Sequence, residues 1–268
     1  MAVADFERGN RSSPVRRLHT HFRGEEFWRE LEKHPRLQHL APELRTTAVT
    51  LASSLSDGIF TPYLGVAEQK AAAGELLWQT DRVSCTRYSF GNALIIYDQP
   101  RPHYTPRRIS HHLRKSGIEI RAHIDANQVN KLLQTEHPYN QFVDLSSFIG
   151  TGSPLDSALQ YLEHLQKGGI GTLGFASTPT IHEPGHQQTV VGYVKNPETN
   201  EVNLALIDPY TPRQLDMWPL HYLLAAMAFQ AIYDYKIPKV QPVTMGKVLG
   251  GFTDISNVMI HRREALAA

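Results

Sequence analysis

Two β-rich runs decide how this chain folds: Gly185-His186-Gln187-Gln188-Thr189-Val190-Val191-Gly192-Tyr193-Val194 and, after a polar turn, Val202-Asn203-Leu204-Ala205-Leu206-Ile207-Asp208-Pro209. Branched and aromatic residues on both sides of a segment with proline and asparagine predict an antiparallel hairpin with a longer loop. A hairpin symmetric about Pro197 places His186 directly opposite Asp208 at its open end. Because Cβ atoms of cross-strand neighbours lie about 5 Å apart, the imidazole and the carboxylate are expected to share a hydrogen bond.

A histidine held by an aspartate is the arrangement of a catalytic base and the group that orients it. Such a base needs a nucleophile, and the chain has one thiol, Cys85. The alternative is that His186 is an ordinary strand-edge residue and that Asp208 only begins a turn. For Cys85 the corresponding alternative is a buried, unreactive thiol.

A metal site is a further candidate, because His182 and His186 are four residues apart. On a helix that spacing presents two ligands on one face. Pro184 and Gly185 lie between the two histidines and disfavour a helix there. We therefore expect no metal at this position.

Composition excludes several classes of protein. With 268 residues, 41% of them hydrophobic, the chain can bury a core as one large domain or as a domain with an added arm. A net charge of +1 gives no general attraction to nucleic acid or to an anionic membrane, and no run approaches the roughly 18 apolar residues of a membrane span. A single cysteine excludes an intramolecular disulfide framework and suits a cytoplasmic or nuclear setting.

The pattern along the chain predicts three segments and an α+β fold. Residues 1–23 are polar and are expected to form a flexible tail. Residues 24–57 are expected to be helical, either as a packed layer or as an arm that grips a partner. Residues 58–268 form the main domain, in which we expect a short strand or loop over 59–63, a strand over 170–177, and helices over 66–77, 157–166 and 217–236.

The segment around the thiol has two interpretations. As a helix that begins near Cys85, it carries four apolar residues on one face, with Ser84 available as N-cap. As a hairpin, it turns at Gly91-Asn92. The difference matters because a thiol at a helix N-terminus has a lowered pKa.

Acyl transfer to a thiol also needs a hydrogen-bond donor for the oxyanion that forms. Gln79 lies six residues before Cys85, which is the spacing that papain uses, and its side-chain amide is our first candidate. Tyr63, some twenty residues upstream of the thiol, is the second candidate. The alternative for Gln79 is an ordinary polar loop residue.

The sequence also resembles a known family. The segment 181–192, together with Asp208-Pro209, is similar to the active-site hairpin of the papain-like peptidases that include the ubiquitin-fold-modifier proteases and the ZUFSP-type deubiquitinases. It is closest to the ZUFSP branch, whose hairpin reads Gly-His-Ser-x-Thr-hydrophobic-hydrophobic-Gly before a downstream Asp-Pro. The modifier-specific branch uses Asp-Pro-His, whereas this chain has Tyr210 after the proline.

The resemblance covers roughly 78–215. The family's Trp-Gly-Cys-x-Tyr-Arg-(Ser/Asn) motif is represented by Val83-Ser84-Cys85-Thr86-Arg87-Tyr88-Ser89, with the aromatic residue and the arginine transposed. Tyr104-Thr105-Pro106 followed by 109–117 is similar to the family's proline-initiated helix that ends in glycine. The resemblance implies a papain-like cysteine protease fold, isopeptidase activity on ubiquitin chains and no catalytic cofactor. By position, it makes 24–57 a candidate for the helical arm that grips ubiquitin.

We therefore expect a Cys-His-Asp isopeptidase that acts on conjugates of ubiquitin or a ubiquitin-like modifier. Cys85 attacks the carbonyl after the C-terminal glycine, His186 moves the proton, and Asp208 orients His186. A narrow cleft would favour a Gly-Gly tail, because only glycines fit a constricted channel. The alternatives are a Cys-His-Asp acyltransferase or transglutaminase-like enzyme, and a catalytically inactive module that binds ubiquitin.

Overall fold

The computed structural model describes residues 24–60, 63–80, 85–96, 154–166, 170–179, 185–213, 215–234 and 241–253, together with residues 107 and 111. The tail expected over 1–23 and most of the helix expected over 109–117 lie outside these residues. In chain order the elements are α3 (Gly24–Lys33), the 3-10 helix η1 (Gln38–Leu40), α4 (Ala41–Ser53), β1 (Gly58–Phe60), α5 (Leu64–Ala72), α6 (Cys85–Ile96), α9 (Pro154–Gln166), β2 (Gly171–Ala176), β3 (Gly185–Lys195), β4 (Val202–Ile207), β5 (Asp216–Pro219), α10 (Leu220–Asp234) and α11 (Met245–Thr253).

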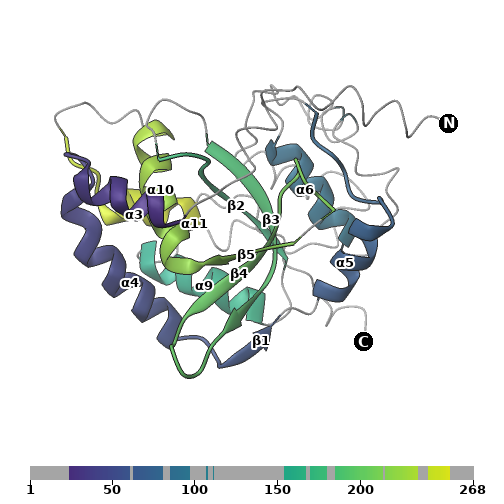
Figure 1. The fold of residues 1–268 in the computed structure, drawn as a ribbon, viewed down its shortest axis with the longest axis horizontal. Helices are drawn as coiled ribbons and strands as arrows, with labels where there is room; N and C mark the ends of the chain where they lie inside the picture. Colours follow the sequence, from purple (N-terminus) through teal and green to yellow (C-terminus); the bar gives the residue numbers. More distant parts are fainter. Residues whose placement is uncertain are drawn as a thin grey trace.

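An antiparallel sheet lies at the centre of the described part of the chain (Figure 1). Its longest strand is β3, which pairs along one edge with β2 and then β1, and along the other edge with β4. Strand β5 pairs with the outer edge of β4. Helices α5 and α6 lie to one side of these strands, and α3, α4, α10 and α11 gather on the other (Figure 1). The expected α+β class with helices packed on a central antiparallel sheet is therefore confirmed.

The helices of 24–57 pack into the same core as the sheet. In α3, Phe27, Trp28 and Leu31 are buried, which is the spacing of one apolar helix face. The ring of Phe27 meets that of Phe229 in α10 edge-on, with centroids 5.7 Å apart. Helix α10 is buried along most of its length, so it forms the centre of this helical side. The helices of 24–57 thus pack as a layer on the rest of the described chain.

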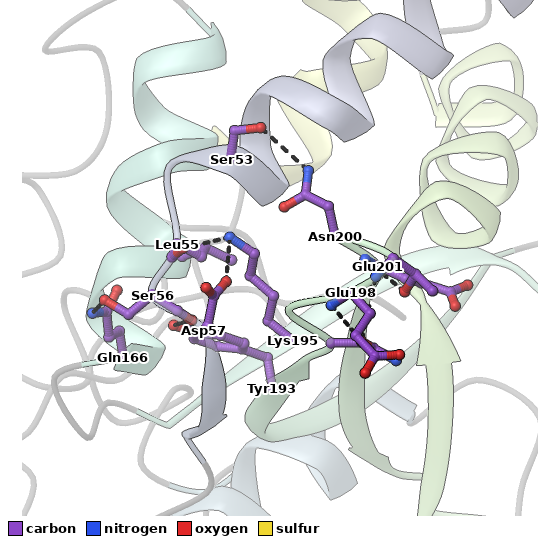
Figure 2. A network of polar contacts seen from close by, with 12 residues as sticks. Ser53, Leu55, Ser56, Asp57, Gln166, Tyr193, Lys195, Glu198, Asn200 and Glu201 are labelled. Carbon is purple, nitrogen blue, oxygen red and sulfur yellow. Dashed lines mark hydrogen bonds and ion pairs between the residues drawn. The ribbon is translucent and has the colours of Figure 1, made fainter.

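A polar network connects the end of α4 to the turn end of the β3–β4 hairpin (Figure 2). Lys195 Nζ donates to the carbonyl oxygen of Leu55 at 2.8 Å and lies 2.9 Å from the carboxylate of Asp57. Between the same two elements, the side chain of Asn200 in the hairpin turn donates to Ser53 Oγ at 3.3 Å. Leu55 lies just past Ser54, the C-cap of α4, so the ammonium group satisfies a buried backbone carbonyl in the segment that leaves the helix. The network therefore fixes the helical layer to the hairpin.

Several element boundaries differ from the expected ones, among them the start of α9, which begins at Pro154 rather than at 157. The helix expected over 66–77 is α5, which ends at Ala72; Gly74 follows with a φ of +68°, a conformation that commonly ends a helix. The helix expected to start at 217 begins at Leu220, because the preceding four residues pair with β4 as strand β5. Helix α11 was not predicted. None of the helices within the described ranges is long and apolar enough to cross a lipid bilayer.

Candidate active site

A β-bulge determines which side chains of the hairpin share a face. Next to the turn, the β3 residues from Lys195 back to Gly192 pair with β4 in one register. Nearer the open end of the hairpin, Val190 and Thr189 pair in a register shifted by one residue, and Val191 is the extra residue between the two. Because side chains alternate between the two faces of a strand, a shift of one residue moves a side chain to the other face. Without the shift His186 and Asp208 would lie on opposite faces. With it, they lie on the same face.

The two residues meet diagonally. Continued past Ile207, the shifted register places Gln188 opposite Asp208, so the directly opposed pair expected from symmetry about Pro197 is wrong. His186 nevertheless donates from Nε2 to Asp208 Oδ1 at 2.9 Å, since diagonal neighbours on one face remain within reach of long side chains. Gln188 donates from its own Nε2 to Asp208 Oδ2 at 3.1 Å.

The turn after β4 holds the carboxylate from the other side. The backbone N–H of Tyr210 donates to Asp208 Oδ1 at 2.8 Å, and the N–H of Thr211 donates to the carbonyl oxygen of Asp208 at 3.0 Å. Aspartate commonly closes a turn onto its own backbone in this way. With the two bonds from the strand, both carboxylate oxygens of the buried Asp208 are engaged.

Cys85 is the first residue of α6, so the helix interpretation of this segment is confirmed and the hairpin interpretation is wrong. Two hydrogen bonds attach the first turns of α6 to β3. Ser89 Oγ donates to the carbonyl oxygen of Gln187 at 2.7 Å, and Thr189 Oγ1 donates to the carbonyl oxygen of Ser89 at 2.9 Å. These bonds hold the start of the helix beside His186, the strand residue that precedes Gln187.

The thiol is a neighbour of the imidazole, and the surroundings of the imidazole favour its charged form. Burial lowers the pKa of His186, but the charge and hydrogen bond of Asp208, followed by the hydrogen bond and charge of Cys85, raise that pKa to about 10. Because Nε2 is bound to the carboxylate, Nδ1 is the ring nitrogen that can take the thiol proton. The site thus favours an imidazolium between two acidic groups, which is the state that a thiolate nucleophile requires.

Gln79 reaches the site through contacts with the turn after β4. Its backbone N–H donates to the carbonyl oxygen of Pro209 at 2.7 Å, and its Nε2 donates to the hydroxyl oxygen of Tyr210 at 3.0 Å. The segment is also held from α6, because Asn92 accepts from the N–H of Leu77 at 2.6 Å and donates to its carbonyl oxygen at 3.1 Å. Gln79 is therefore a buried side chain with defined partners.

Tyr63, the second candidate donor, is buried immediately before α5. None of the contacts described above involves it. The structure thus places Cys85, His186, Asp208 and Gln79 in one set of connected residues. The contacts described above do not link Tyr63 to this set.

Three residues of the site were not predicted. Tyr210 stacks on the imidazole of His186, with ring centroids 5.1 Å apart and 24° between the planes. Gln188 contacts Asp208, and its position two residues after His186 on the same strand was the signal that could have identified it. Asp216, at the start of β5, has a pKa raised to about 6 by burial and by the charge of Asp208.

The metal interpretation gains no support. His186 lies in a strand, so the spacing from His182 does not place the two on one helix face, and His182 itself lies outside the described residues. Among the residues that are described, no group of three or more His, Cys, Asp or Glu side chains could hold a metal ion. No protein-family model, curated protein or solved structure matches the chain, so the geometry of the site has to carry the functional assignment.

Proposed function

We propose that this chain is a papain-like cysteine isopeptidase that cleaves ubiquitin or a ubiquitin-like modifier from a lysine side chain. One observation carries the proposal: His186 Nε2 lies 2.9 Å from Asp208 Oδ1, and Cys85, at the first position of a helix that hydrogen bonds of Ser89 and Thr189 attach to the same strand, lies close enough to influence the imidazole. A thiol, an imidazole and a carboxylate in this order are the nucleophile, base and orienting group of a cysteine protease.

The arrangement of elements supports a papain-like fold. The thiol lies on a helix that packs against an antiparallel sheet, and the sheet carries the histidine and then the carboxylate. An amide side chain, that of Gln79, precedes the thiol in the sequence and joins the site from the other side. This is the order that the hairpin and cysteine motifs predict by their resemblance to the papain-like family.

The chemistry follows from these positions. The sulfur of Cys85, after its proton passes to His186, attacks the carbonyl carbon of the modifier's C-terminal glycine, which is bonded to the lysine nitrogen. A donor such as the amide of Gln79 stabilises the oxyanion of the tetrahedral intermediate. His186 then gives the proton to the leaving lysine amine, which departs and leaves a thioester. Water, deprotonated by His186, attacks the thioester and releases the modifier with a free carboxylate and the regenerated thiol.

The helical layer formed by α3 and α4 lies at the turn end of the hairpin and keeps an exposed outer side. An arm-like contact between 24–57 and the modifier would use this outer side. The catalytic step does not depend on it.

The test uses ubiquitin that carries an electrophile at its C-terminus, together with di-ubiquitins of each lysine linkage. We expect covalent labelling of the wild-type protein that Cys85→Ala abolishes, and release of free ubiquitin from at least one linkage. His186→Gln should reduce labelling at least a hundredfold, whereas His221→Gln, a half-buried histidine at the start of α10, should leave it unchanged.

The other outcomes distinguish the alternatives. A thiol that small alkylating agents modify but the ubiquitin probe does not would indicate an acyltransferase or transglutaminase-like enzyme that uses the same three groups on other acyl donors. Ubiquitin binding with neither labelling nor cleavage would indicate an inactive binding module. A thiol that reacts with neither ubiquitin probes nor small alkylating agents would refute the proposal altogether.

A further inference from the structure

Tyr210 contacts three parts of the site at once. Its ring stacks on His186, its backbone N–H donates to Asp208 Oδ1, and its hydroxyl oxygen accepts a hydrogen bond from Gln79 Nε2. These partners come from β3, from the end of β4 and from the segment before α6. A residue at their junction can fix how the amide of Gln79 is turned relative to the base.

We infer that Tyr210 is a positioning residue that orients the amide of Gln79 as the oxyanion donor of this site. The inference rests on the proposed isopeptidase function and goes beyond it. The amide of a glutamine has a donating end and an accepting end. An amide rotated by half a turn would present its oxygen to a developing oxyanion and would destabilise it.

The contact with Tyr210 favours one of these two orientations. Gln79 Nε2 donates to the hydroxyl oxygen at 3.0 Å, so the nitrogen end of the amide faces the side of the site where His186 and Tyr210 stack. An amide nitrogen has two N–H groups, and donating one to a hydroxyl still allows the other to donate to an oxyanion. The backbone of Gln79 is held in place by a hydrogen bond of 2.7 Å from its N–H to the carbonyl oxygen of Pro209.

The ring and the hydroxyl of Tyr210 contact different residues, so their effects can be separated by substitution. The ring covers one face of the imidazole and excludes water from the hydrogen bond between His186 and Asp208. The hydroxyl accepts the hydrogen bond from Gln79 Nε2. Tyr210→Phe therefore removes the orienting contact and keeps the cover, which makes it the informative variant.

The kinetic experiment is a double-mutant cycle on cleavage of a ubiquitin conjugate. We expect Gln79→Ala to lower kcat by about 10²–10³, the effect of losing one oxyanion donor. Tyr210→Phe should lower kcat roughly five- to tenfold with KM unchanged. The double variant should be no slower than Gln79→Ala alone, because Tyr210 acts through Gln79. Tyr222→Phe, which removes a hydroxyl at the start of α10, serves as the matched control and should retain wild-type kcat.

Two further readouts separate orientation from a general loss of structure. The pH profile of Cys85 alkylation by iodoacetamide should be the same in Tyr210→Phe as in the wild type, because the thiol, imidazole and carboxylate are untouched. In a ¹H–¹⁵N spectrum, Tyr210→Phe should move the side-chain amide signals of Gln79 and leave those of Gln188, which is bound to Asp208, in place.

The spectrum decides the inference even if the proposed function fails. If the wild type cleaves no conjugate, the isopeptidase assignment falls, and the amide signals alone decide whether Tyr210 orients Gln79. Unmoved Gln79 signals in Tyr210→Phe would overturn the inference whatever the activity. Losses of kcat that add in the double variant would also overturn it, as would a wild-type kcat in Gln79→Ala.

Discussion

The bulge in β3 gives the sharpest test of how this site is assembled, and Gly192→Ala is the perturbation that addresses it. Gly192 lies at the shift in register and has a φ of +147°, which side chains other than glycine rarely adopt. Holding an alanine there costs on the order of 1–3 kcal/mol. Since about 1.4 kcal/mol corresponds to a factor of ten, the ratio of folded to unfolded protein should fall roughly five- to 150-fold.

The matched control is Gly174→Ala in the neighbouring strand β2. A Cβ at Gly174 would meet no heavy atom within 4 Å, and its φ is not in the strained region. Adding a methyl group there should change the free energy of unfolding by less than about 1 kcal/mol, and it is expected to stabilise the strand slightly. Urea unfolding of the two variants and the wild type, with the m-values compared, measures both effects.

The bulge also affects the chemistry. If the alanine pushes β3 toward the uninterrupted register, His186 moves away from the face of Asp208, and the rate of Cys85 alkylation near neutral pH should fall. Deletion of Val191 removes the extra residue and joins the two registers without changing any pair, so His186 should stay on the face of Asp208 and that reactivity should be kept. Equal stability of Gly192→Ala and Gly174→Ala, or loss of thiol reactivity in a folded Val191 deletion variant, would refute the reasoning that the bulge aligns the site.

Three further predictions concern charged groups. The folded-state pKa of His186 is about 10, above the ordinary 6.5, so the stability that it contributes is complete below pH 6.5 and is lost as the pH rises through 10. Between pH 7 and pH 10 the free energy of unfolding should therefore fall further in the wild type than in His186→Gln. The raised pKa of Asp216, about 6, destabilises its charged form, so Asp216→Asn should stabilise the protein at pH 7 by about 1 kcal/mol and by nothing at pH 3.5. Lys195→Met leaves the carbonyl oxygen of Leu55 without its donor and should cost about 1–3 kcal/mol in thermal or urea unfolding, while alkylation of Cys85 keeps its wild-type rate.

The sequence predicted the chemistry of the hairpin better than its geometry. The two runs of branched and aromatic residues on either side of a turn segment were enough to identify both strands and to bring His186 near Asp208. It could not give the register, because the bulge changes the pairing by one residue and leaves the hydrophobic pattern intact. A glycine inside a strand is the one local signal of such an irregularity.

The surroundings of the site depend on contacts that no local pattern contains. Gln79 was identified by its spacing from the thiol, but its partners, Pro209 and Tyr210, follow more than a hundred residues later in the chain. The sequence predicts a helix from 217 because the largely apolar run begins there and continues into α10. Pairing with β4, a tertiary interaction, makes 216–219 a strand instead.

The site is assembled from three segments, and each is held by backbone or buried polar contacts outside the reacting groups. The helix that carries Cys85 is bound to β3 through Ser89, and the carboxylate is closed onto its own turn by the N–H of Tyr210. The imidazole needs no such contact of its own, because its strand is central in the sheet and paired along both edges. Reacting groups on rigid elements, supported by a surrounding set of hydrogen bonds, are expected where position must be kept to within about half an ångström. A buried thiol that served only to fill the core would require none of these supports.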